Sequence, residues 1–68
     1  MDVATLADLL RETEEHHGHY EATAPEHDWS VWYAAYISAR ERGRTPGEAS
    51  SDAALYLERE RAGKGPNV

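Results

Sequence analysis

Two sets of helix-breaking residues divide this chain into three segments. Pro25 makes the first break, because the residue before a proline is pushed out of the helical region. Gly43 and Pro46 make the second, since glycine suits the end of one helix and proline the start of the next. Apolar residues recur at helical spacing in all three segments, and none alternates like a strand. We therefore expect an all-α fold with helices over residues 3–22, 28–42 and 46–61.

Capping residues stand at the expected helix starts. Asp2 can cap a helix with a side-chain oxygen, and either Asp28 or His27 begins the second helix. Thr45, with Glu48 three residues later, forms the pattern of a capping box around Pro46. These positions predict where each helix begins.

Each expected helix has a characteristic distribution of apolar residues. The second helix is apolar nearly all round, which predicts a central position between the other two. In the third helix, Leu55 points away from the core face, which comprises Ala49, Ala53, Tyr56 and Leu57. In the first helix, the predicted core stripe comprises Val3, Leu6, Leu9, Leu10, Thr13, His17 and Tyr20. Its opposite, polar face comprises Asp8, Glu12, Glu15 and His19.

The 68-residue length predicts one domain, over residues 1–62, followed by a disordered tail over 63–68. A chain of about this size buries only about 60% of its unfolded surface, so its core is marginal. Small domains of this kind are usually reinforced by disulfides, a metal, self-association or very good helix packing. The chain has no cysteine, which excludes disulfides and fits a reducing compartment.

The charge distribution is uneven, with a net charge of −6. Residues 1–28 carry eight acids and one base, Arg11. An acidic half of this kind repels nucleic acids and anionic membranes. The chain has neither an apolar run long enough to span a bilayer nor the pattern of a signal peptide. We therefore expect a cytoplasmic protein that binds neither nucleic acid nor membrane.

One stretch, residues 16–36, holds all four histidines, both tryptophans and three of the four tyrosines. An aromatic stripe at helical spacing can build the core, line a ligand cleft or form a dimer interface. His16 and His19 fall at the border of the apolar stripe and on the polar side, and are expected at the surface. The candidate ligand- or interface-binding residues are His17, Tyr20, His27, Trp29, Trp32, Tyr33 and Tyr36.

His17 has two interpretations. It can be a core histidine with one hydrogen-bond partner, because buried polar groups are normally paired. It can also be a metal ligand, since Glu14 and Glu21 stand one turn away and His27 could return across the loop. Imidazole and carboxylate ligands around an open position would suit zinc or iron. The inner face of the second helix supplies no further carboxylate.

An ordered set of residues between positions 16 and 49 resembles a known group of proteins. The set comprises His16-His17, Tyr20-Glu21, His27, Trp29, Trp32-Tyr33-Ala34-Ala35-Tyr36, Ala39-Arg40-Glu41-Arg42-Gly43, Thr45-Pro46 and Glu48-Ala49. It is similar to small helical proteins of actinobacteria that often carry a bleomycin-resistance or glyoxalase-like label. The glyoxalase fold is built from βαβββ units, and none of its catalytic residues maps onto this chain. The resemblance implies an actinobacterial, cytoplasmic, helical protein and no activity.

The sequence therefore predicts a non-enzymatic helical binding or interaction module, with no catalytic residue that we can name. Its expected partner is a second copy of the chain or a larger protein. The alternative is a metal or small-molecule site, which could be catalytic, built from His17, Glu14 or Glu21, and His27. A further alternative is a pH-sensitive assembly through the four histidines.

Overall fold

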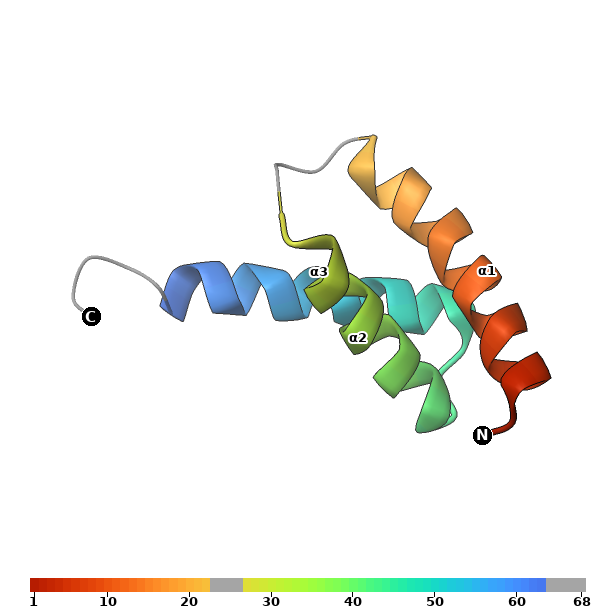
Figure 1. Cartoon of the computed structure of the whole chain (residues 1–68). Helices are drawn as coiled ribbons and strands as arrows, with labels where there is room; N and C mark the ends of the chain where they lie inside the picture. Colours follow the sequence, from red (N-terminus) through yellow and green to blue (C-terminus); the bar gives the residue numbers. More distant parts are fainter. Residues whose placement is uncertain (23–26, 64–68) are drawn as a thin grey trace.

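The computed structural model describes residues 1–22 and 27–63 of the chain. It contains three helices, α1 (Val3–Glu21), α2 (Trp29–Glu41) and α3 (Pro46–Gly63), and this part of the chain has no strand (Figure 1). The prediction of an all-α, three-helix fold is confirmed, and each helix boundary lies within two residues of the expected one. No helix in the described ranges is long and apolar enough to cross a bilayer.

Side-chain caps form at all three helix starts, and those at Asp2 and Thr45 were predicted. The carboxylate of Asp2 accepts a hydrogen bond from the backbone N–H of Thr5 at 3.1 Å. Asp28 accepts one from the backbone N–H of Ser30 at 3.0 Å. The capping box before α3 is complete, because the hydroxyl of Thr45 accepts from the Glu48 N–H at 3.2 Å and the carboxylate of Glu48 accepts from the Thr45 N–H at 2.9 Å.

Gly43 ends α2 in the left-handed conformation, with φ of 89°. Its N–H donates to the carbonyl of Arg40 at 3.0 Å, and the next N–H, of Arg44, donates to the carbonyl of Ala39 at 3.1 Å. These two bonds are those of the Schellman motif, which satisfies carbonyls at the end of a helix. The turn sends the chain directly into α3.

α2 is the central helix, as its apolar composition predicts. It packs against both α1 and α3, and its contact with α3 is the more extensive (Figure 1). The core contains two large aromatic side chains from α2, and small side chains let α3 approach them closely. The buried apolar residues are Trp32, Tyr36, Ala39, Ala49, Ala53 and Leu57.

The expected core stripe of α1 is wrong over its first two turns. Val3 is 86% exposed, and Leu6 and Leu10 are also exposed. The helix is rotated about its axis, so that Leu9, Glu12 and Thr13 face the other helices. Polar contacts between Glu12 and α2 account for this rotation, and they leave an apolar edge of α1 in solvent.

α3 differs from expectation at one position. Tyr56, predicted in the core, is 55% exposed. The core face of α3 follows a spacing of four through Ala49, Ala53 and Leu57, and this spacing leaves Tyr56 to one side. Leu55 is 44% exposed, as predicted. The predicted tail lies outside the described residues from position 64 onward, and Gly63 belongs to α3.

Candidate functional site

His17 lies in the second half of α1 and faces the start of α2. It is buried, with 6% of its surface exposed. Its Nε2 atom lies 2.8 Å from Nε2 of His27, just before the capping residue of α2. Its other nitrogen, Nδ1, lies 3.7 Å from a carboxylate oxygen of Glu21. One nitrogen of the His17 imidazole thus faces a histidine and the other faces a carboxylate.

Aromatic rings surround the two histidines. The ring centroid of His17 lies 5.2 Å from those of Trp32 and Tyr33. The ring centroid of Tyr20 lies 4.8 Å from that of His27 and 5.6 Å from that of Trp32. Burial in this cluster raises the pKa of the Tyr33 phenol, and the charges of Glu14 and Glu21 raise it further. The cluster therefore fixes both imidazoles between α1 and α2.

The predicted aromatic stripe of α2 divides into buried and exposed members. Trp32 and Tyr36 stack with centroids 5.3 Å apart and an interplanar angle of 17°, and neither has exposed surface. The indole N–H of Trp32 has no hydrogen-bond partner among the described residues. Trp29 is 62% exposed, and its ring packs edge-on against Tyr33 with the ring centroids 5.3 Å apart. Trp32 and Tyr36 thus belong to the core, and Trp29 to the surface.

The four residues of the predicted metal site do not converge. His17 and His27 meet through their Nε2 atoms, whereas Glu21 faces the opposite nitrogen of His17. Glu14 is exposed on α1. No three histidine, aspartate, glutamate or cysteine side chains of the described part of the chain gather around one metal position.

A partly buried polar network that the sequence did not indicate joins α1 to α2. The carboxylate of Glu12 accepts a hydrogen bond from the Tyr36 hydroxyl at 2.6 Å and one from Arg40 Nε at 2.7 Å. The Arg40 guanidinium lowers the pKa of Glu12. Burial, followed by the hydrogen bond to Glu12, raises the pKa of Tyr36. The helical pattern of α1 places Glu12 on the polar face. Tyr36 and Arg40 stand one turn apart on α2, however, and can both reach one acid.

The remaining two histidines of α1 differ in exposure. His19 is exposed, as predicted. His16 is half-buried, and its ring stacks on Tyr36 with centroids 5.5 Å apart and an interplanar angle of 27°. The expectation of a surface position for His16 is therefore only half met, because the rotation of α1 brings it toward α2.

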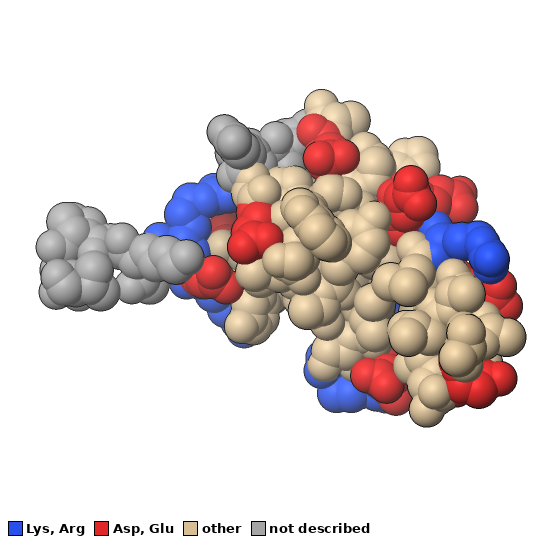
Figure 2. All heavy atoms as spheres, viewed as in Figure 1, with Lys and Arg blue, Asp and Glu red and all other residues tan. Residues whose placement is uncertain are grey.

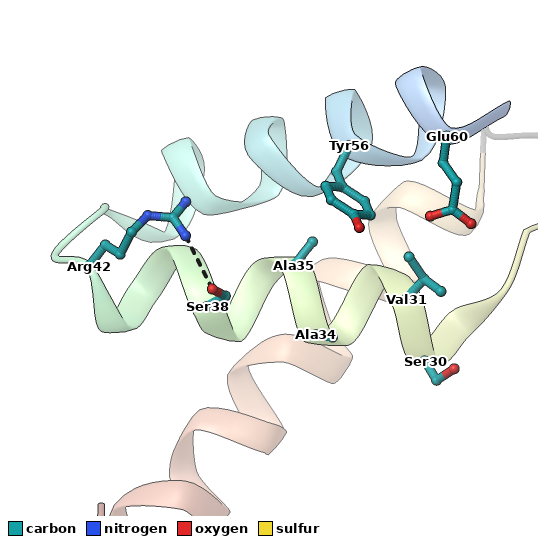
Figure 3. A pocket seen from close by; sticks show the side chains of 8 residues that line it. All are labelled: Ser30, Val31, Ala34, Ala35, Ser38, Arg42, Tyr56 and Glu60. Atoms are coloured by element: carbon teal, nitrogen blue, oxygen red, sulfur yellow. Dashed lines mark hydrogen bonds between the residues drawn. The ribbon is translucent and has the colours of Figure 1, made fainter. Parts of the chain in front are cut away.

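An open groove lies between α2 and α3 (Figure 3). It has a volume of about 540 Å³. Small and apolar side chains form most of its surface, with Arg42 at one end and Glu60 at the other (Figure 3). The lining residues are Ser30, Val31, Ala34, Ala35, Ser38, Arg42, Tyr56 and Glu60. The sequence signal of this groove is the apolar surface of α2 beyond its core face.

No match was found when the chain was compared with known protein families, with characterised proteins and with solved structures. The resemblance to actinobacterial helical proteins therefore stays a prediction. The fold and its contacts are the grounds on which a function can be argued.

Proposed function

We propose that this chain is a non-enzymatic helical interaction module that works by self-association. The observation that supports the proposal most directly is the apolar surface left exposed by the three packed helices. Leu55 and Tyr56 stand in solvent on α3, and Trp29 does so at the start of α2. Exposed apolar patches are typical of protein interaction sites. Tyrosine and tryptophan are enriched at the centres of such sites.

The size of the core gives a physical reason for association. The large fully buried side chains are Trp32, Tyr36 and Thr13, and much of the remaining core is alanine. A second copy would remove further apolar area from water, and such burial contributes a favourable free energy of about 25 cal/mol per Å². Self-association is one of the usual ways in which domains of this size gain stability.

The distribution of charge is compatible with this role. Uncharged side chains cover the middle of the face seen in Figure 2, and charged side chains lie mainly around it. Protein interfaces have a centre poor in charge and a polar rim. We place the module in a reducing compartment such as the cytoplasm, which the absence of cysteine fits.

Sedimentation equilibrium and light scattering from low micromolar to millimolar concentration test the proposal. A mass that rises with concentration to a defined multiple of 7.6 kDa is expected. Melting temperature should rise over the same range, because association stabilises only the folded chain. A folded monomer at every concentration would overturn the proposal of self-association.

A transition-metal site at His17 and His27 is the second candidate, and the convergence of their Nε2 atoms favours it. Two zinc–nitrogen bonds of about 2.0–2.1 Å at a tetrahedral angle would hold the nitrogens about 3.3 Å apart. The pair would therefore have to open by about half an ångström. Glu21, beside Nδ1 of His17, is placed to orient that ring, as carboxylates do for metal-bound histidines. Water would complete the coordination.

Thermal melts with zinc, with iron and with a chelator test this candidate. A metal that binds only the folded state raises the melting temperature by mass action. The shift should disappear in His27→Ala and persist in the control His19→Ala, because His19 is exposed and away from the pair. Equal melting temperatures with and without metal would eliminate the site.

A further inference from the structure

We propose that two copies of the chain meet through the groove between α2 and α3, related by a two-fold axis that sets the two α2 helices antiparallel. This inference rests on the proposed self-association and adds the face and the geometry. A two-fold contact uses the same surface on both copies, so this surface must be complementary to itself. The opposite charges at the two ends of the groove meet this condition.

The floor of the groove is built for close helix contact. Ser30, Ala34 and Ser38 follow one another at intervals of four on α2, and Ala35 lies beside them (Figure 3). Small side chains in such a row let a second helix approach to the shorter end of the usual 8–10 Å range of axial distances. The ring of Tyr56 stands above this row from α3 (Figure 3). The groove therefore offers a strip of small residues with an aromatic wall.

The ends of the groove carry opposite charges. Arg42 lies at one end, where its guanidinium donates to the hydroxyl of Ser38 at 3.1 Å, and Glu60 lies at the other (Figure 3). A two-fold rotation about the middle of the groove brings Arg42 of each copy to Glu60 of the other. A parallel arrangement would instead place like charges together at both ends, which is unfavourable. Charge thus selects the antiparallel two-fold pairing.

The exposed apolar edge of α1 is the competing surface. It consists of Val3, Leu6 and Leu10. Residues 1–28, which include α1, carry eight acids and one base, so two copies joined through this edge would bring two strongly acidic segments together. Like charges that face each other oppose association. The groove is nearly balanced in charge, and it is therefore the surface suited to a second copy.

Two matched substitutions separate the faces. Ala34→Glu places a charge on the exposed floor of the groove, and Leu6→Glu places one on the edge of α1. In sedimentation equilibrium, Leu6→Glu should leave the dissociation constant of the dimer nearly unchanged. Ala34→Glu should raise it at least about tenfold, since a buried unpaired charge is costly. Circular dichroism confirms that both variants are folded. A dimer lost with Leu6→Glu and kept with Ala34→Glu would overturn the choice of face.

A charge exchange tests the geometry. Arg42→Glu alone and Glu60→Arg alone each set like charges together twice in the dimer, so each should raise the dissociation constant by at least about tenfold. The double variant Arg42→Glu/Glu60→Arg restores both pairs and should return to within about threefold of the original value. Glu58→Arg, an exposed position on α3 that does not line the groove, is the matched control and should have little effect.

The outcomes distinguish this inference from the proposed function. A chain that is monomeric at all concentrations removes both. A dimer that dissociates with Ala34→Glu but is not rescued by the charge exchange keeps self-association through the groove and overturns the antiparallel pairing. A dimer insensitive to all groove substitutions keeps self-association and overturns the groove as its site.

Discussion

Nε2 of His17 and Nε2 of His27 lie 2.8 Å apart, and this contact joins the second half of α1 to the start of α2. One ring must donate a proton in this hydrogen bond and the other must accept it. Aromatic rings cover the pair on several sides, so that water does not easily replace either partner. The contact therefore holds together two segments that are separated in the chain by the α1–α2 connection.

His27→Ala should lower the free energy of unfolding by about 1–3 kcal/mol, because it leaves a buried nitrogen of His17 without this partner. Urea unfolding followed by circular dichroism measures the change. A double-mutant cycle with His17→Leu isolates the contact, since the pair should cost less together than the sum of the single variants. Additive losses would show that the two rings do not stabilise each other.

Glu12 gives a prediction for acid pH. Its pKa is lowered in the folded protein from an ordinary value of 4.5, because Arg40 donates a hydrogen bond to the ionised carboxylate. The folded state therefore binds this proton less tightly than the unfolded state. The resulting stability is fully present above the ordinary pKa and is lost as pH falls through the lowered one.

Unfolding measurements from neutral pH to about pH 3 should show this loss in the wild-type chain and a flatter profile in Glu12→Gln. At neutral pH the substitution should cost about 1–2 kcal/mol, since it removes the charge that pairs with Arg40. Glu58→Gln, at an exposed position of α3, controls for the loss of one negative charge. Parallel pH profiles for wild type and Glu12→Gln would contradict the assignment.

Two glycines should respond in opposite directions to the same substitution. Gly43 has φ of 89°, so Gly43→Ala should destabilise the protein by about 1–2 kcal/mol. Gly18 lies within α1, and a Cβ atom there meets nothing within 4 Å, so Gly18→Ala should stabilise by about 0.5–1 kcal/mol. Thermal melts of both variants check the prediction. A loss of stability in Gly18→Ala would mean that α1 packs differently around this position.

The two tryptophans should be distinguishable by fluorescence. Trp29→Phe leaves the fully buried Trp32, whose emission should lie at short wavelength and resist quenching by acrylamide. Trp32→Phe leaves the exposed Trp29, with the opposite behaviour, and should cost about 1–3 kcal/mol because it removes part of a stacked core ring. Similar quenching in both variants would contradict the division between core and surface.

The helix boundaries were predictable because the signals that set them are local. A carboxylate at Asp2, the capping box at Thr45 and the glycine at position 43 each act on backbone groups within a few residues. The candidate site was only partly predictable. The pairing of His17 with His27 agrees with the core interpretation of His17, whereas the role of Glu12 was missed because its partners lie on another helix.

Local signals in the sequence set the three helices and the place of α2 between the others, since caps, breakers and the period of apolar residues depend on neighbours along the chain. The rotation of each helix about its axis follows instead from contacts between helices. Arg40 and Tyr36 draw Glu12 inward, which turns Leu6 and Leu10 outward. The spacing of Ala49, Ala53 and Leu57 against α2 leaves Tyr56 beside an open groove. Rotation depends on which side chains meet across helices, and a helical period of apolar residues fixes it only when polar partners do not compete.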